Sequence, residues 1–356
     1  MSGQAGARAF LRRFWTALIV AVVATVTAVA GAYWVAARKV AQVPKVAIDP
    51  ALLKSGGNYL LIGSDSRAFV DNAKDSSEFG SASSQTGQRS DTIMLAHVDG
   101  DPAKSFLVSF PRDLWVDIPG MGHAKINAAF NAGPQRVIQT IEQNFDVPVS
   151  HYLEVDFSGF RKLVDTIGTV PIYFPAPARD AKTGLSISTA GCHQLNGEQA
   201  LAYVRSRYYE SYIDGKWQVD GTSDLGRIKR QQYFLRTIAH EALKTAERAP
   251  WKAPRILDSM LANLTRDPKL GFSSFRAFAY AFHGDGTGMP TYTLPTTPKY
   301  INGQAALLLQ DSAAAPLFAR LRGEKGSAAA STPHVQLIRS TRAASGPADA
   351  LPAAGC

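Results

Sequence analysis

Residues 89–113 read RSDTIMLAHVDGDPAKSFLVSFPRD, and this stretch decides the fold. It holds two apolar runs of strand length, at residues 93–98 and 105–110. Between them, residues 99–102 read Asp-Gly-Asp-Pro, which is a composition typical of turns. The stretch therefore predicts two strands joined in a β-hairpin.

Two arginines and two carboxylates should meet at one edge of this hairpin. The first strand begins beside the end of the second, so Arg89 and Asp91 should lie close to Arg112 and Asp113. Protein surfaces often carry such charges as solvated ion pairs. Alternatively, the arginines bind phosphate oxygens in a bidentate manner and the carboxylates hold a hard cation between them. These residues alone leave both interpretations open.

A preceding strand is predicted to end at the same edge. Residues 58–62 are an apolar run, and Gly63-Ser-Asp65-Ser-Arg67 follows directly. If this strand runs parallel to the second strand of the hairpin, Asp65 and Arg67 reach the other charged side chains. Residues 68–88 are rich in Ser, Gly and Ala, and we predict that they form a mobile loop over this edge.

Composition limits the class of protein. The chain has 356 residues, 46% hydrophobic and 19% charged, which is enough for one large globular domain or two smaller ones. The formal net charge of +9 fits a phosphate-rich partner or a membrane surface. Zinc-finger, RNP-like, HExxH, GxSxG and P-loop patterns are absent from the sequence, so we expect no nucleic-acid partner.

The first 57 residues have the pattern of a membrane anchor. Residues 1–13 form a basic arm, residues 14–37 are uncharged and predict one transmembrane helix, and residues 38–57 form a linker with two prolines. A cleaved signal peptide is the alternative, but the apolar run is longer than a typical one and no clear cleavage site follows. We expect a cytoplasmic N-terminus and an extracytoplasmic chain after residue 40.

Strand and helix patterns alternate after the hairpin. Strands are predicted at residues 114–118, 152–155 and 170–174, and helices at 125–145, broken at Gly133-Pro134, and at 157–167. This alternation predicts an α/β (mixed α+β) fold, with a central mixed sheet flanked by helices on both faces. Four apolar residues are candidates for the wall of a pocket, although ordinary core is their usual role: Phe130, Ile138, Phe157 and Phe160.

A further helix carries two arginines at its end. Asn196 and Gln199 have capping-box spacing, and the helix should end near Arg205-Ser-Arg207. Two arginines two residues apart diverge on a helix but can converge where the helix opens out. Residues 208–223 are predicted as a polar loop.

The next helix should present an anion site near its start. Asp224 suits an N-cap, and the helix should continue to about Arg248. Arg227 and Gln231 are four residues apart on one face, near the positive end of the helix dipole. An exposed basic face is the alternative, but apolar residues indicate that much of this helix is buried: Ile228, Phe234, Leu235 and Ile238.

The remainder extends the same domain. Residues 251–310 contain two more helical patterns and a strand at 291–294. We therefore predict one domain over residues 58–322, followed by a partly disordered tail over 323–356. The two cysteines, Cys192 and Cys356, are too far apart for a CxxC motif, and in an oxidising compartment we expect them to form a disulfide.

Seven motifs in order resemble the LytR-CpsA-Psr family of bacterial wall-polymer ligases, over roughly residues 58–248. They are Gly63-Ser-Asp65-Ser-Arg67, Arg89-Ser-Asp91-Thr92, Ser109-Phe-Pro-Arg112-Asp113, Lys125-Ile-Asn127, Leu195-Asn-Gly-Glu-Gln-Ala-Leu-Ala-Tyr203, Val204-Arg205-Ser-Arg207 and Asp224-Leu-Gly-Arg227-Ile-Lys-Arg230-Gln231-Gln232. Residues 68–88 and 208–223 look like insertions between these motifs.

The resemblance implies a single-pass membrane transferase. Such an enzyme takes a glycopolymer from a polyprenyl-pyrophosphate carrier and joins it to peptidoglycan through a phosphodiester, with a magnesium or manganese ion and an apolar pocket for the polyprenyl chain. Asp65 and Asp91 would hold the ion. The catalytic set would be Arg89, Asp91, Arg112 and Asp113, and the pyrophosphate would be bound by Arg67, Arg89, Arg112, Arg205, Arg207, Arg227 and Gln231. Asp113 would act as a base or would only orient Arg112.

Two other functions compete with this one. Water in place of the glycan hydroxyl would give a polyprenyl-pyrophosphate phosphatase, as a main or side activity. A non-enzymatic binder of wall polymer or lipid carrier would need the arginines but not Asp65 and Asp91, so these carboxylates favour an enzyme. The Ala-rich, Arg-rich composition suggests an actinobacterium, in which arabinogalactan is a plausible polymer beside teichoic acid.

Overall fold

The computed structural model describes residues 2–46, 57–64, 90–262, 264–282, 289–324 and 356. The chain forms two compact units, Met1–Gln42 and Val43–Cys356. The predicted loop at 68–88 and most of the predicted tail therefore lie outside the described residues.

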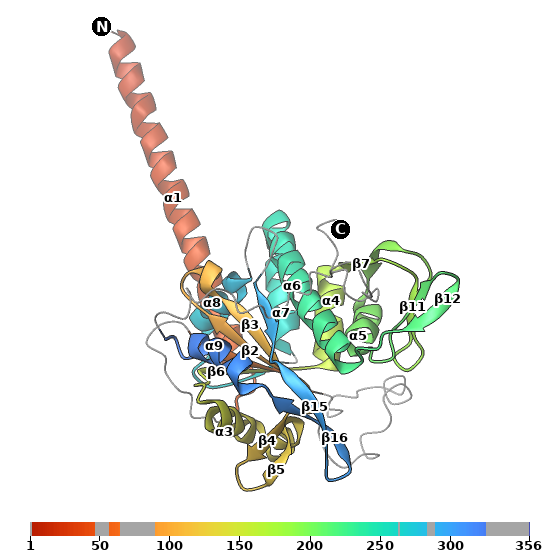
Figure 1. The fold of residues 1–356 in the computed structure, drawn as a ribbon. Coiled ribbons are helices and arrows are strands. Elements are labelled where there is room, and N and C mark those ends of the chain that lie inside the picture. Colours follow the sequence, from red (N-terminus) through yellow and green to blue (C-terminus); the bar gives the residue numbers. More distant parts are fainter. Residues whose placement is uncertain (1, 47–56, 65–89, 263, 283–288, 325–355) are drawn as a thin grey trace. The chain divides into compact units, whose positions relative to one another are not determined.

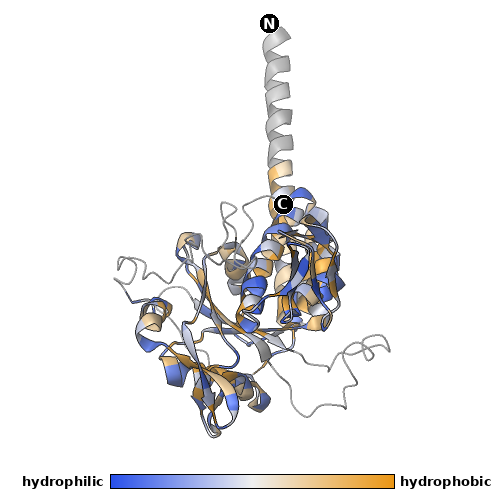
Figure 2. Ribbon diagram, turned by 45° about the vertical axis from the view of Figure 1, so that its right-hand side comes forward, coloured by the Kyte–Doolittle hydropathy of each residue, from blue (hydrophilic) through white to orange (hydrophobic). Residues whose placement is uncertain are grey.

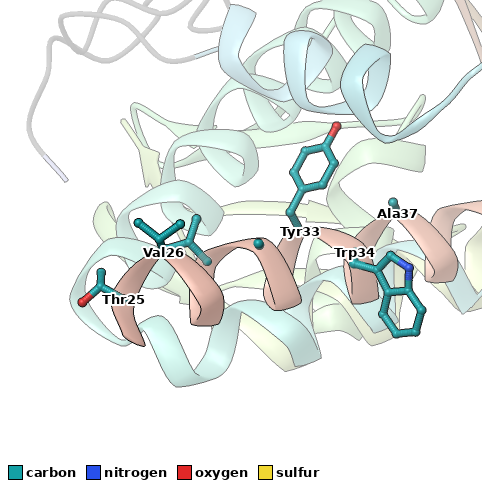
Figure 3. Close-up of a pocket in the computed structure, with 7 residues that line it drawn as sticks. Thr25, Val26, Tyr33, Trp34 and Ala37 are labelled. Carbon is teal, nitrogen blue, oxygen red and sulfur yellow. The ribbon is translucent and has the colours of Figure 1, made fainter. Parts of the chain in front are cut away.

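The first unit is helix α1 (Ser2–Gln42), in which Ala21–Gln42 is long and apolar enough to cross a membrane. The predicted segment at 14–37 lies within this helix. Figure 3 shows labelled side chains that project from α1, including Val26, Tyr33 and Trp34. The shallow hollow between them is lined by residues of α1 alone. Trp34 is 55% exposed, so this surface suits an apolar environment better than water.

The second unit is built around the predicted mixed sheet (Figure 1). Its strand order is β13-β6-β1-β2-β3-β14. The strands are β1 (Gly57–Ser64), β2 (Ser90–Val98), β3 (Phe106–Phe110), β6 (His151–Asp156), β13 (Leu264–Arg266) and β14 (Thr291–Thr293). β2 and β3 form the predicted hairpin. β1 is antiparallel to β2 and therefore runs in the same direction as β3, so the ends of β1 and β3 lie at one edge of the sheet, as predicted.

Alternation along the strands separates two cores. In β1, Leu60 and Ile62 belong to the core under η3 (Ile126–Ala132), α3 (Pro134–Phe145) and α9 (Asp311–Leu321). Leu61 and Gly63 point to the opposite face, which carries α4 (Phe157–Ile167), α5 (Gly197–Arg205), α6 (Asp224–Arg248), α7 (Ala253–Ala262) and α8 (Phe272–Ala281). The helices of this unit carry both orange and blue segments in Figure 2, as expected for helices with one buried face.

The predicted polar loop at 208–223 is wrong, because it contains a hairpin. Strands β11 (Glu210–Ile213) and β12 (Lys216–Val219) are joined by Asp214 and Gly215, both at positive φ. Asp-Gly is a strong hairpin signal, and Tyr212 pairs with Trp217 across the strands. β11 also pairs with β8 (Ala178–Asp180), which the sequence did not predict, and β8 pairs with β9 (Leu185–Ile187).

The remaining elements are short. They are β4 (Trp115–Ile118), β5 (Gly122–Lys125), β7 (Val170–Phe174), β10 (Gly191–Leu195), β15 (Thr296–Ile301), β16 (Gln304–Leu309), η2 (Pro102–Lys104) and η4 (Pro250–Lys252). Cys192 in β10 and Cys356 form the disulfide that the sequence predicted.

Candidate functional site

The site lies at the sheet edge where β1, β3 and β6 end and β2 begins. Arg112 and Asp113 follow β3, as predicted from the hairpin. Gly63 pairs with Thr92 but Ser64 pairs with Ser90, so Asp91 is the extra residue of a β-bulge. Three predicted site residues, Asp65, Arg67 and Arg89, lie outside the described residues, and so does the side chain of Asp91.

Asp224 gathers three of the predicted arginines around one carboxylate. Its Oδ1 lies 2.8 Å from Nη2 of Arg227, 3.5 Å from Nε of Arg112 and 3.7 Å from Nε of Arg207. The prediction that Asp224 is an N-cap is wrong, because Asp224 is the first residue of α6 and Ser223 holds the cap position without a side-chain bond. Asp224 therefore turns toward the arginines rather than toward the backbone of its own helix.

Asp113 holds two cations at the same edge. Its Oδ1 lies 2.9 Å from Nζ of Lys125, and its Oδ2 lies 3.6 Å from Nε of Arg112. In the cluster formed by Arg112, Lys125, Arg207, Arg227, Asp113 and Asp224, the cations outnumber the carboxylates. The described cluster is therefore suited to an anion that carries more than one negative charge.

The turn that carries Arg205 and Arg207 is fixed by a buried carboxylate. Asp180 of β8 accepts hydrogen bonds at 2.6 Å from Ser206 Oγ and at 3.0 Å from the backbone nitrogens of Arg207 and Tyr208. Burial disfavours the charge of Asp180, but these bonds and one from Lys182 outweigh burial and lower its pKa. Asp180 thus holds the backbone at the end of α5 in position.

Helix α6 fixes the same turn from the other side. Arg230 donates to the carbonyl of Ser206 at 2.7 Å and pairs with Asp220 at 3.0 Å. Gln231 donates from Nε2 to the carbonyl of Val204 at 3.2 Å. The guanidinium of Arg205 lies over a ring of α4, 4.7 Å from the ring centroid of Phe157. Residues of β8, α6 and α4 therefore position Arg205 and Arg207, and both arginines line the same cavity.

An apolar cavity of about 590 Å³ adjoins the arginines. Polar residues line one part of it, namely Asp156, Asp180, Lys182, Thr183, Arg205, Arg207, Tyr208, Arg227 and Gln231. The rest is mainly apolar and comes from the sheet (Leu61, Met94, Leu153, Val155, Leu264) and from four helices (Phe157, Phe160, Leu163, Leu201, Val204, Phe234, Leu235, Ile238, Phe275, Phe278). A cavity with this lining can take a lipid chain whose charged head is bound by the arginines.

Two of the four predicted pocket residues line this cavity. Phe157 and Phe160 do so from α4. Phe130 and Ile138 instead belong to the core on the opposite face of the sheet, which is the ordinary role that the sequence analysis gave as the usual one. A helical apolar pattern shows that a residue is buried, but it does not show which face of the sheet its helix covers.

Two buried side-chain oxygen atoms at the ends of β1 and β6 are possible ligands for the predicted metal ion. Ser64 and Asp156 are cross-strand partners, and Ser64 Oγ and Asp156 Oδ2 have no hydrogen-bond partner among the described residues. Burial raises the pKa of Asp156, against the bonds from Gly159 and Ser158. Such oxygens fit the ligands of a hard cation. Among the side chains that the structure describes, no three His, Cys, Asp or Glu form a metal-binding group, and Asp65 and Asp91 are not among them.

Comparison with known proteins identifies the family. The model of the LytR_cpsA_psr family matches residues 21–322. The chain belongs to the LytR-CpsA-Psr family. The central sheet, helices on both faces and the one N-terminal apolar helix agree with the fold that the resemblance implied.

Similar curated proteins come from several bacteria. The chain is 35% identical over 191 residues to the probable cell wall biosynthesis protein LcpB of Corynebacterium glutamicum, covering 53% of this chain and 42% of that protein. It is 34% identical over 167 residues to the regulatory protein MsrR of Staphylococcus aureus, covering 46% of this chain and 47% of MsrR. It is 29% identical over 222 residues to the teichoic acid transferase TagU of Oceanobacillus iheyensis, covering 60% of this chain and 64% of TagU. The chain thus spans about half the length of the curated relatives it matches.

Solved structures share the fold. A LytR-Csp2A-Psr enzyme from Actinomyces oris has a TM-score of 0.61 and 24% identity, covering 78% of this chain and 95% of that one. TagT bound to LIIa-WTA has a TM-score of 0.53 and 22% identity, covering 76% of this chain and 91% of the TagT chain. The similarity to LcpB of Corynebacterium agrees with the actinobacterial source that composition suggested.

Proposed function

We propose that the protein is an extracytoplasmic phosphotransferase. It moves a glycopolymer from a polyprenyl-pyrophosphate carrier to a hydroxyl of peptidoglycan and forms a phosphodiester. One observation carries this proposal: Arg112, Arg207 and Arg227 converge on one carboxylate, and Arg207 and Arg227 also line the apolar cavity. An anion site joined to a lipid-sized cavity suits a substrate with a pyrophosphate between a lipid and a sugar. Relatives such as the teichoic acid transferase TagU support the same reaction class.

The residues suggest how the reaction proceeds. The hydroxyl oxygen of the acceptor attacks the phosphorus that bears the glycan and gives up its proton to water. The bond from this phosphorus to the bridging oxygen breaks, so that polyprenyl phosphate leaves with the electron pair. Arg112, Arg207 and Arg227 stabilise the charge on the phosphoryl oxygens, and removing one such donor commonly costs on the order of 10²–10³ in rate. A magnesium ion held by Asp65 and Asp91 would add charge stabilisation at the pyrophosphate. Asp113 pairs with Arg112 and Lys125, which supports an orienting role for Asp113.

The test compares variants of the full-length protein in detergent. A short-chain polyprenyl pyrophosphate reports binding with and without magnesium, and glycan linkage reports turnover. We expect Asp91→Asn to lose turnover and the magnesium dependence of binding, because it loses the charge that holds the ion. Arg207→Lys should also lose turnover, because it loses the planar fork of donors. Arg248→Lys, an exposed arginine at the other end of α6, is the matched control and should keep both.

The same experiment separates the competing functions. Wild-type transfer by Asp91→Asn would contradict the metal assignment, whereas binding without any transfer by the wild type would favour the non-enzymatic binder. Release of phosphate by the wild type without an acceptor would favour the phosphatase.

A further inference from the structure

An exposed tryptophan marks the turn between α6 and α7. Trp251 of η4 is 75% exposed, a value that equals that of Tyr300 and exceeds those of the other exposed large hydrophobic residues described outside α1. Three exposed cations surround it in sequence: Arg248, Lys252 and Arg255. Glu247 is the carboxylate in this stretch, so the cations are in excess. We call residues 247–255 the α6–α7 corner.

The fold holds the α6–α7 corner in an ordered turn. The Ala249 nitrogen donates to the carbonyl of Thr245 at 2.9 Å, and the Lys252 nitrogen donates to the carbonyl of Ala249 at 2.8 Å. Ile256, one turn into α7, is only 5% exposed and belongs to the core that α4, α5 and α6 share. Trp251 therefore stays outside the core on a well-anchored turn, and its exposure requires a reason other than local disorder.

The α6–α7 corner lies far from the arginines that surround Asp224 in the candidate site. Asp224 is the first residue of α6 and Arg248 is its last, and a helix of 25 residues is about 37 Å long. Helix α6, labelled in Figure 1, thus separates the end of the domain that holds Arg227 from the end at which η4 carries Trp251.

The apolar cavity also runs away from the arginines. At one end it is lined by Asp156, the last residue of β6. At the other it is lined by Phe278 of α8, whose ring centroid lies 5.4 Å from that of Tyr59. Tyr59 pairs with His151, the first residue of β6. The cavity therefore extends from the charged edge of the sheet past Asp156, Val155 and Leu153 of β6 toward the opposite edge.

We propose that the α6–α7 corner docks on the surface of a bilayer that contains anionic phospholipid. The indole of Trp251 enters the interfacial layer, where tryptophan is enriched, and Arg248, Lys252 and Arg255 pair with lipid phosphates. This contact is separate from the anchoring by α1. On the proposed function, docking sets the direction in which the lipid enters: the tail passes from the bilayer into the Phe278 end of the cavity, and the pyrophosphate reaches the arginines.

The first test measures whether Trp251 enters lipid. The full-length protein is reconstituted in vesicles of phosphatidylcholine and phosphatidylglycerol, with lipid brominated near the headgroup to quench nearby indoles. We expect Trp251→Phe to remove a quenched component of the fluorescence. Trp217→Phe, at an exposed tryptophan of β12, should remove an unquenched component, and the tryptophans of α1 contribute equally to all samples. Equal quenched intensity in Trp251→Phe and the wild type would overturn the proposal.

The second test concerns charge. In Lys252→Glu/Arg255→Glu, both substitutions are at exposed positions, and circular dichroism checks the fold. We expect the quenching of Trp251 to fall severalfold in vesicles with phosphatidylglycerol, and high salt to do the same to the wild type. Unchanged quenching in this variant would overturn the electrostatic contact. Because quenching needs no turnover, lost docking in an active enzyme contradicts this inference alone, and intact docking in an inactive enzyme contradicts the proposed function alone.

Discussion

At the scale of single residues, Asp224 explains how three arginines can share a small volume. Arg227 is 1% exposed and Arg112 and Arg207 lie near it, so their charges would repel one another without a carboxylate between them. A bound pyrophosphate would supply the same negative charge from outside. We therefore expect Asp224 to organise the arginines when no ligand is bound and to compete with a bound pyrophosphate for them.

This role predicts a ligand-dependent defect in Asp224→Asn. Without ligand, we expect the unfolding free energy to fall by about 1–3 kcal/mol, because three guanidiniums lose their shared charge. Pyrophosphate should raise the melting temperature of the variant more than that of the wild type. Asp214→Asn, in the exposed β11–β12 turn, is the control and should change neither quantity. An equal pyrophosphate shift in Asp224→Asn and the wild type would show that Asp224 does not compete with the anion.

Asp180 predicts a pH dependence with a definite sign. Its pKa is lowered below the ordinary value of an aspartate, because its hydrogen bonds outweigh burial. A carboxylate with a lowered pKa stabilises the fold above its unfolded pKa, and this contribution is lost as pH falls through its folded pKa. The wild type should therefore exceed Asp180→Asn in unfolding free energy by a constant amount above about pH 5. Chemical denaturation at several pH values should show this difference shrinking below pH 3.8, and a difference that grows there would contradict the assignment.

At the scale of elements, the charged edge of the sheet could be predicted from the sequence, because the segments that form it are close together along the chain. The hairpin of β2 and β3 follows from two apolar runs and one turn, and it fixes Arg112 beside the start of β2. The capping box at Asn196 was predicted in the same way and is present. The β11–β12 hairpin was missed although Asp214-Gly215 signals it, because each of its strands has only four residues, too few to show a clear alternation.

The contact between α4 and α5 predicts the effect of one methyl group. A Cβ on Gly197 would lie 2.6 Å from the carbonyl oxygen of Arg161 and 2.9 Å from the carboxylate of Asp165. Alanine is the better helix former by about 1 kcal/mol, but overpacking against backbone costs about 1–3 kcal/mol. We therefore expect Gly197→Ala to lower the unfolding free energy and to shift Arg205, which α5 carries. Gly221→Ala, with open space around its Cβ, is the control, and a more stable Gly197→Ala would refute the packing argument.

At the scale of the whole molecule, sequence patterns predicted the mixed sheet and the family but not how distant segments meet. Asp180 and Asp220 lie in segments for which no role was predicted, yet they position the turn at Ser206 and the guanidinium of Arg230. The sequence named Phe130 and Phe157 together as candidates for a pocket wall, and the fold places them on opposite faces of the sheet. Such assignments depend on three-dimensional packing, which a periodic pattern along one chain does not contain.

The disulfide between Cys192 and Cys356 leads to a prediction about the membrane topology of the protein. Cys192 and Cys356 are 164 residues apart and form a disulfide, which persists in oxidising compartments. If the domain is extracytoplasmic, a thiol label should not react with the folded or unfolded protein until a reductant is added. Cys192→Ser should then lower the free energy of unfolding by about 2–4 kcal/mol, because the bond constrains the unfolded chain.

A reporter that is active only outside the cytoplasm should work when fused after Cys356, and the same reporter at the N-terminus should fail. Activity of a strictly cytoplasmic reporter at Cys356, with two free thiols before reduction, would reverse the proposed orientation of α1.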